Sequence, residues 1–265
     1  MAGNSSNRET GSGQKKKIVV SVIIPVYNGA ATVGTALESA LTQSVEKEII
    51  VINDCSTDSL DEVMTGYIDN PVIHYIKNEK NIGVAETRNR GVMMAKGEYV
   101  AFLDADDWWE EGKIRKQLLY LKKTNTVLCA TGRELLTPAG MPTGRVIPVS
   151  EKITYQMLLG GNVINCSSVL LKTEVAKQFP MEHPDSHEDY LTWLKILKKY
   201  RQASAVNEPL LKYRLSTSGK SGSKLQSAKM TFKVYRYMGF GLVKSCWCFV
   251  CYAVNGIKKY LKARM

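Results

Sequence analysis

Short apolar runs alternate with amphipathic segments over the first hundred residues. The runs have the length of buried strands and are rich in β-forming residues: 18–26, 48–53, 72–76 and 99–103. The segments between them carry apolar side chains at helical spacing: 30–41, 59–68 and 84–95. This alternation predicts an α/β fold, a Rossmann-like and mainly parallel sheet with helices on both faces.

The strand predicted at residues 99–103 ends abruptly in three acids, Asp104, Asp106 and Asp107. The carboxyl ends of parallel strands are where α/β sheets bind ligands. Three crowded carboxylates repel one another unless a cation lies between them, and a divalent cation shared with substrate phosphates is one solution. The alternative is an acidic turn in which Asp107 caps a helix that begins at Glu110.

Other polar residues follow the neighbouring strands. Tyr27 and Asn28 follow the first strand, Asp54 follows the second, and Arg88 lies one turn into a later helix. An aromatic ring for stacking, an acid for a base N–H and an arginine together suit a nucleotide. Each residue also has a structural alternative: Tyr27 as a strand-end aromatic, Asp54 as an Asx-turn residue and Arg88 as a surface ion-pair partner. Neither GxGxxG nor GxxxxGK[ST] occurs after a predicted strand.

The second half of the chain is less regular. Strands are predicted at 127–130 and 169–172, and residues 133–136 and 146–149 are expected to pair as a hairpin. The helix predicted at 190–200 has an apolar face and follows Glu188 and Asp189. A helix N-terminus favours ionised carboxylate, the form that a general base needs. The alternative is that both acids only stabilise the helix dipole.

Charge is distributed unevenly along the 265 residues. The composition, 44% apolar and 23% charged, suits a soluble domain, but the net charge is +11. No acid follows Glu208, whereas twelve basic residues do: Lys212, Arg214, Lys220, Lys224, Lys229, Lys233, Arg236, Lys244, Lys258, Lys259, Lys262 and Arg264. A terminal basic block indicates contact with an anionic surface, either phospholipid or nucleic acid.

Six scattered cysteines give no disulfide framework and suit a reduced, cytosolic setting. Residues 1–16 are polar and are expected to be disordered. The apolar run that follows them breaks at Pro25 without a small-residue cleavage site, so we interpret it as a strand and not as a signal peptide.

Residues 238–257 are long enough to suggest a transmembrane helix. Lys244 and Asn255 interrupt them, however, and a span needs about twenty apolar residues. The aromatic residues of this segment and its basic flanks suit a helix lying in a membrane interface. The alternative is a helix that packs against the catalytic domain or against a second copy of the chain.

Several of these segments resemble the motifs of inverting family-two glycosyltransferases with the GT-A fold, which include enzymes that build bacterial capsule, O-antigen and teichuronic acid. The matching pieces cover most of residues 18–215: 22–28, 52–58, 81–89, 96–99, 102–107 and 188–189. A small departure is Glu111, where many relatives have proline.

The resemblance implies roles for individual residues. Pro25, Tyr27 and Asn28 would line the nucleotide pocket, with Asp54 binding the base and Arg88 lying beside it. Asp104 would face the ribose, Ala105 would belong to the same nucleotide-sugar site, and Asp106 would hold Mg²⁺ or Mn²⁺ on the diphosphate. Asp189 would be the catalytic base, and Glu188 its neighbour near the acceptor. The loop with Asn165 would approach the sugar.

The implied activity is metal-dependent, inverting transfer of one sugar from a nucleotide-sugar, a UDP-sugar by preference, to a hydroxyl of a lipid-linked saccharide in cell-surface polysaccharide biosynthesis. Residues 17–218 would form the GT-A domain. Residues 219–265 would form basic amphipathic helices that hold the enzyme on the inner face of the plasma membrane or make a homo-oligomer. The Gln/Arg-x-x-Arg-Trp motif of processive synthases is absent from the sequence, which favours single-residue transfer.

Two other classes of protein fit less well. A sugar nucleotidyltransferase would carry a Gly-rich basic loop after the first strand, and residues 25–29 are not one. A nucleic-acid-binding protein would carry its basic excess on a folded recognition module, whereas residues 1–208 are close to neutral. We therefore expect no nucleic-acid partner.

Overall fold

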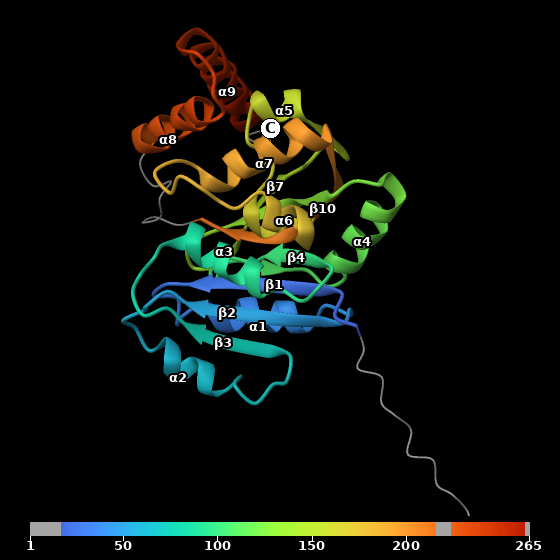
Figure 1. Cartoon of the computed structure of the whole chain (residues 1–265), viewed down its shortest axis with the longest axis vertical. Helices are drawn as coiled ribbons and strands as arrows, with labels where there is room; N and C mark the ends of the chain where they lie inside the picture. The colour runs from blue at the N-terminus through green and yellow to red at the C-terminus, as the bar shows by residue number, and fades with distance from the viewer. Residues whose placement is uncertain (1–16, 216–223, 263–265) are drawn as a thin grey trace, which may run out of the picture.

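A ten-stranded sheet runs through the computed structural model, which describes residues 17–215 and 224–262. Its first half is parallel, in the order β3-β2-β1-β4. These strands are β1 (Val20–Val26), β2 (Lys47–Asn53), β3 (Ile73–Lys77) and β4 (Tyr99–Phe102). They confirm the four strands predicted for the first hundred residues (Figure 1).

The second half of the sheet mixes directions and continues from β4 in the order β9-β6-β10-β5. Its strands are β5 (Trp108–Trp109), β6 (Leu128–Leu136), β7 (Pro142–Ile147), β8 (Lys152–Thr154), β9 (Leu170–Lys172) and β10 (Gln202–Arg214). The pairing of β7 with β6 confirms the predicted hairpin, although β7 begins earlier than expected and ends at Ile147.

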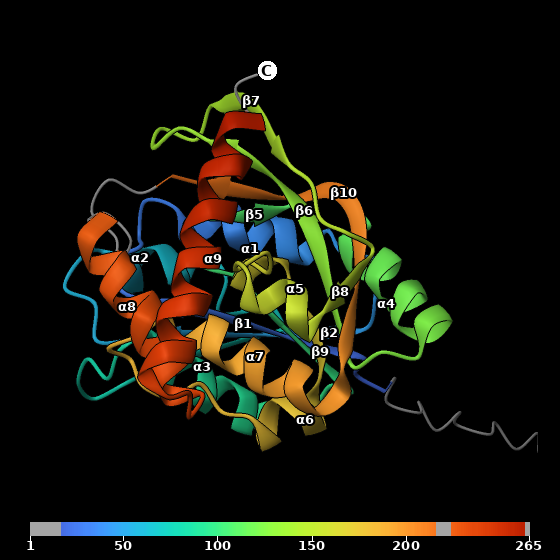
Figure 2. The ribbon, with the colours of Figure 1, turned by 90° about the horizontal axis from the view of Figure 1, so that it is seen from above.

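Helices cover both faces of the sheet, and each face has its own apolar cluster. One face carries α1 (Val33–Leu41), α2 (Leu60–Thr65) and α4 (Lys113–Thr124). The other carries α3 (Val84–Met94), α5 (Tyr155–Leu159), α6 (Thr173–Gln178) and α7 (Glu188–Tyr200), as Figure 2 shows from above. The predicted fold class, a mainly parallel α/β sheet flanked by helices, is confirmed.

Two details differ from the sequence predictions. The helix expected from Glu110 is α4, which begins only at Lys113, after Gly112 in the left-handed region (φ 76°). Asp107 instead accepts a hydrogen bond from the Arg214 backbone N–H (3.0 Å). The alternative of Asp107 as a helix cap is therefore wrong. The long strand β10 was not predicted. Its pairing with β6 is interrupted between Val206 and Leu211, and this irregularity breaks the alternation that marks a strand.

The basic tail forms two helices, α8 (Lys224–Tyr237) and α9 (Leu242–Lys262), joined by a turn at Gly239 (φ 80°). Their inner faces join the apolar cluster of α7 through residues such as Tyr235 and Cys248. Within the described part of the chain, no helix is both long and apolar enough to cross a bilayer. The segment expected to be disordered, 1–16, and the expected domain junction at 218–219 lie outside the described residues.

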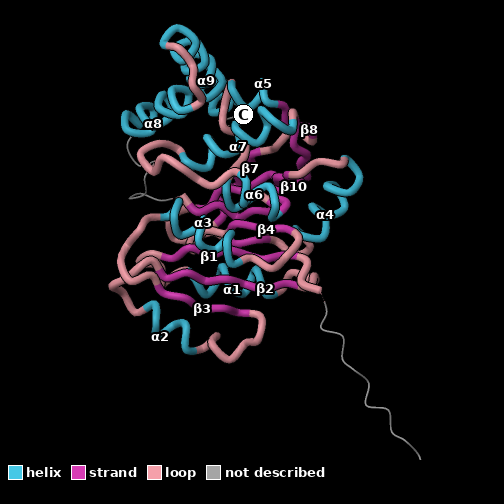
Figure 3. Tube along the Cα trace, in the orientation of Figure 1, coloured by secondary structure: helices cyan, strands magenta, loops and turns pink. Residues whose placement is uncertain are grey.

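The ends of the parallel strands position the candidate site. Val26, the last residue of β1, pairs with Asn53, the last residue of β2, and Ile23 pairs with Phe102 at the end of β4. Because these strands are parallel, the loops that follow them gather along one edge of the sheet (Figure 3).

Candidate active site

The loop after β1 is tied to the loop after β2. Asn28 has a left-handed backbone (φ 51°), which asparagine tolerates better than most residues. Its N–H donates to Ser56 Oγ (3.0 Å), and its Oδ1 accepts from the Thr57 N–H (2.8 Å). Tyr27 is exposed at this edge, whereas Pro25 is buried inside β1, so Pro25 can only support a pocket from below.

Asp54, directly after β2, fixes the loop that leads into α3. Its buried carboxylate accepts from Asn78 Nδ2 (2.7 Å) and from the backbone N–H groups of Ile82 (2.9 Å) and Gly83 (2.8 Å). Carboxylates with several donors are held firmly in place. Asp54 therefore lies on the expected edge and shapes the loop beside it, and its contact with a base stays a prediction.

The acidic turn after β4 lies against the loop after β1. A Cβ on Gly29 would come within 3.3 Å of Ala105 Cβ, so glycine permits this close approach. Burial and the negative charge of Asp104 raise the pKa of the half-buried Asp106 carboxyl. Burial, followed by the charges of Asp104 and Asp106, also raises the pKa of Asp107 well above its usual range. The acidic turn concentrates negative charge, and a bound cation would reduce the repulsion between its carboxylates.

Asp106 has the chemistry of a ligand for a hard divalent cation. Among the residues that the structure describes, no group of three or more His, Cys, Asp and Glu side chains is arranged to enclose a metal ion. Mg²⁺ usually binds through one or two carboxylates and completes its shell with substrate phosphates and water. The half-buried carboxylate of Asp106 beside Asp104 fits that mode of binding.

Sequence analysis did not identify two residues that hold the acidic turn. Arg214, at the end of β10, donates from its backbone N–H to Asp107 Oδ1 (3.0 Å) and from Nε to the Asp106 carbonyl (3.0 Å). Ser167 Oγ accepts from the Asp104 N–H (3.1 Å). Asn165, a weak sugar candidate, accepts from the Ser167 N–H (2.9 Å) and thereby shapes the same loop. No local motif marks Arg214, because its partners lie more than a hundred residues away in the chain.

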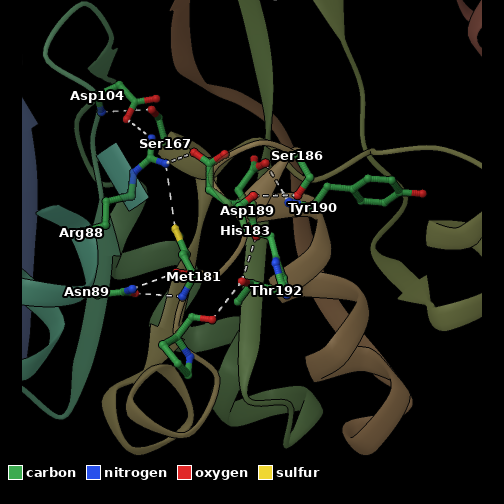
Figure 4. A network of polar contacts seen from close by, with 12 residues as sticks. Arg88, Asn89, Asp104, Ser167, Met181, His183, Ser186, Asp189, Tyr190 and Thr192 are labelled. Carbon is green, nitrogen blue, oxygen red and sulfur yellow. Dashed lines mark hydrogen bonds and ion pairs between the residues drawn. The ribbon is translucent and has the colours of Figure 1, made fainter. Parts of the chain in front are cut away.

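Arg88 joins two regions that are far apart in the sequence (Figure 4). Its buried guanidinium donates to Asp104 Oδ1 (2.5 Å) and lies 3.5 Å from Glu188 Oε1. Burial disfavours the charged guanidinium, but the carboxylates of Asp104 and Glu188 outweigh that effect and raise the pKa of Arg88. Arg88 therefore stays charged and links the acidic turn to the start of α7.

Asp189 lies at the start of α7, where the sequence placed a base. Its Oδ1 accepts from the Tyr190 N–H (2.7 Å). Burial, followed by the charge of Glu188, raises the pKa of Asp189, which makes it a better proton acceptor once ionised. The apolar face of α7 is buried as predicted, and Trp193 packs near Phe102 of β4 with ring centroids 6.2 Å apart.

His187 also lies at the start of α7, but its side chain does not cap the helix. Its Nε2 lies 3.1 Å from Ser227 Oγ in α8. This contact joins the turn before α7 to the first of the two tail helices.

Solved structures with a similar fold are glycosyltransferases. Staphylococcus aureus TarS in complex with UDP-GlcNAc superposes with a TM-score of 0.68 at 18% identity, over 88% of this chain and 70% of that one. The Pyrobaculum calidifontis mannosyltransferase PcManGT, in complex with GDP-Man and Mn²⁺, superposes with a TM-score of 0.67 at 16% identity, over 89% of this chain and 73% of that one. The GT-A fold that the sequence implied is confirmed.

Sequence relatives are similar over nearly their whole length. Bacillus subtilis TuaG, assigned to teichuronic acid biosynthesis, is 38% identical over 92% of this chain and 98% of its own. Escherichia coli WfaP, a UDP-Glc:α-D-GlcNAc-diphosphoundecaprenol β-1,3-glucosyltransferase, is 32% identical over 91% and 95%. The family described as "Glycosyl transferase family 2" matches residues 21–170. On these similarities and on its fold, the chain is a glycosyltransferase that belongs to family 2.

Proposed function

We propose that this enzyme transfers a single sugar, with inversion, from a UDP-sugar to a hydroxyl of a lipid-linked saccharide. The observation that carries the proposal is the position of Arg88, which contacts Asp104 on one side and Glu188, next to Asp189, on the other. The donor's anomeric carbon and the base that activates the acceptor hydroxyl must be held at a fixed separation for the two to react. The name of the relative WfaP supports a UDP-sugar donor and a diphosphate-lipid acceptor.

The donor lies along the edge formed by the loops after β1, β2 and β4. Tyr27, exposed at this edge, stacks on the base, Asn28 shapes the pocket wall, Pro25 supports it from below, and Asp54 receives a base N–H. Asp104 and Ala105 face the ribose side, and Asp106 would hold a divalent metal ion. A bound Mg²⁺ or Mn²⁺ would offset the charge that develops on the leaving diphosphate.

The acceptor approaches from the start of α7. Asp189 takes the proton from the acceptor hydroxyl as its oxygen forms a bond to the anomeric carbon. The bond between that carbon and the diphosphate oxygen breaks on the opposite face, and the electron pair leaves with the diphosphate. Inversion follows from one such displacement, without a covalent enzyme intermediate. Glu188 keeps Arg88 in place beside the acceptor.

Because the acceptor is carried on a lipid, the enzyme must act at a membrane surface. We therefore place the enzyme in the cytoplasm, peripheral on the inner face of the plasma membrane, in cell-surface polysaccharide biosynthesis. The basic C-terminal helices are the part of the chain suited to that contact. Their alternative role is in a homo-oligomer.

A transfer assay tests the proposal. The protein is incubated with UDP-sugars and a GlcNAc-diphosphate-lipid, with Mg²⁺, with Mn²⁺ or with EDTA, and products are followed by mass spectrometry and by NMR of the anomeric proton. We expect one added sugar, inverted relative to the donor, and loss of product in EDTA. Retention of the donor's anomeric configuration, or transfer that persists in EDTA, would contradict the proposal.

A further inference from the structure

The outer face of α9 is apolar and exposed. Val243, Trp247, Val250 and Val254 recur at intervals of four, three and four residues, so they share one side of the helix. Val243 is 87% exposed and Trp247 is 69% exposed. Four such positions extend over about 17 Å at the rise of an α-helix. Contiguous exposed apolar side chains of this size mark an interaction surface.

The inner face of the same helix is fixed on the catalytic domain. The Tyr252 ring packs near Tyr190 of α7, with centroids 6.0 Å apart, and Asn255 Nδ2 donates to the Gly160 carbonyl (2.9 Å). Cys248 is buried in the same cluster. Figure 2 shows α9 running alongside α5 and past one end of α7. The packing of the inner face therefore orients the apolar stripe outward.

Both tail helices carry exposed basic side chains. The exposed residues of α8 include Lys229, Lys233 and Arg236, and Lys244 lies on the flank of α9. Beside the turn between the helices is a cavity of about 410 Å³ lined by Phe179, Lys195, Lys198, Lys199, Tyr237 and Met238. Since no acid follows Glu208, the two tail helices bring no negative charge to this surface.

We propose that the outer face of α9 binds an anionic phospholipid surface, with Trp247 and its neighbours in the interface and the exposed Lys229, Arg236 and Lys244 against the headgroups. An apolar stripe with aromatic and basic residues is the composition of helices that lie in a membrane interface. Each basic side chain near an anionic leaflet adds to the attraction. A second copy of the chain would place like charges opposite each other, so charge favours lipid as the occupant.

The lipid-facing helices also contact the turn that carries the base. Asp185 accepts from Lys233 Nζ (2.7 Å) and from the Tyr237 hydroxyl (2.8 Å), both on α8. The His183 ring stacks on Tyr237 with centroids 3.8 Å apart. α8, which packs against α9, therefore contacts the segment before Asp189. This deepens the proposed function and rests on it in one respect, the lipid-linked acceptor.

Binding to vesicles tests the inference with the full-length protein. Phosphatidylglycerol–phosphatidylcholine vesicles are compared with phosphatidylcholine vesicles by co-sedimentation, at low and at high salt. We expect binding only to the anionic vesicles, weakened by salt and reduced roughly tenfold or more by Val243→Ser combined with Trp247→Ser. The matched control is Leu119→Ser, which removes a similarly exposed side chain from α4 and should bind as the unmodified protein does.

A second set of measurements separates this inference from the proposed function. Circular dichroism must show that the double variant is folded, and affinity for UDP-sugar must be unchanged. Equal vesicle binding by the double variant and the unmodified protein would overturn the inference, as would a dimer in sedimentation that the double variant dissociates. Vesicle binding without any sugar transfer would leave the inference standing and refute the proposed function.

Discussion

Replacing Arg88 by methionine should destabilise the fold and disrupt the site together. The guanidinium is 6% exposed and lies against Asp104 (29% exposed) and Glu188 (7% exposed). Methionine keeps much of the apolar length of the arginine side chain but removes its charge and its donors. Two carboxylates would then face each other in a poorly solvated region without a cation.

The size of the effect follows from the burial of these groups. Removing one partner of a buried ion pair costs about 3–5 kcal/mol, and the partial exposure of Asp104 places Arg88→Met near the lower end, about 3 kcal/mol. For a chain of this size, each kcal/mol lowers Tm by roughly 2–4 °C, so we expect a fall of roughly 6–12 °C.

Urea unfolding followed by circular dichroism measures the change in the free energy of unfolding. The matched control is Lys116→Met, which removes a lysine paired with Glu208 at a half-exposed site, where an ion pair contributes at most about 1 kcal/mol. If Arg88→Met lost no more stability than Lys116→Met, Arg88 would not be the buried link between the acidic turn and α7.

Three further predictions concern the chemistry. Because the pKa of Asp189 is raised and a base must be ionised to act, kcat/KM should fall as the pH drops through a pKa above the usual aspartate range. Glu188→Gln removes a negative charge that raises this pKa, so it should move the acidic side of the pH profile to lower pH. An unchanged profile in Glu188→Gln would show that Glu188 does not raise the pKa of Asp189. Asp106→Ala should weaken UDP-sugar binding in calorimetry and abolish its dependence on Mn²⁺, whereas metal-dependent binding in this variant would place the ion elsewhere. Ser227→Ala combined with Tyr237→Phe should lower kcat roughly tenfold while KM for the donor is unchanged. These two residues contact His187 and Asp185, in the turn before Asp189, and lie away from the proposed donor site. A change in KM alone would contradict a positioning role.

The parallel half of the fold was predictable because its signals are local. Each strand from β1 to β4 is a short apolar run, and each is followed within a few residues by a polar side chain at the edge of the sheet. The positions of Asp54, Asp104 and Asp106 on one edge followed from strand direction alone. The start of α7 was equally clear from its apolar spacing.

The contacts that complete the site depend on tertiary structure. The partners of Arg214 lie in a turn that precedes it by more than a hundred residues, and β10 itself is irregular where it passes Asn207 and Pro209. Arg88 was expected beside the base pocket, and only the fold reveals its contacts with Asp104 and Glu188. The tail was expected either at a membrane or against the protein, because its apolar residues occupy both sides of α9.

Asp189 is proposed as the base that activates the acceptor on the far side of the donor site. The most direct test compares the unmodified protein with Asp189→Asn, measuring UDP-sugar affinity by calorimetry and sugar transfer to a GlcNAc-diphosphate-lipid in the same preparations. We predict that Kd changes by no more than about threefold, while kcat falls by roughly 100-fold to 10,000-fold, the usual contribution of a general base. Near-normal turnover by Asp189→Asn would contradict the assignment of the base.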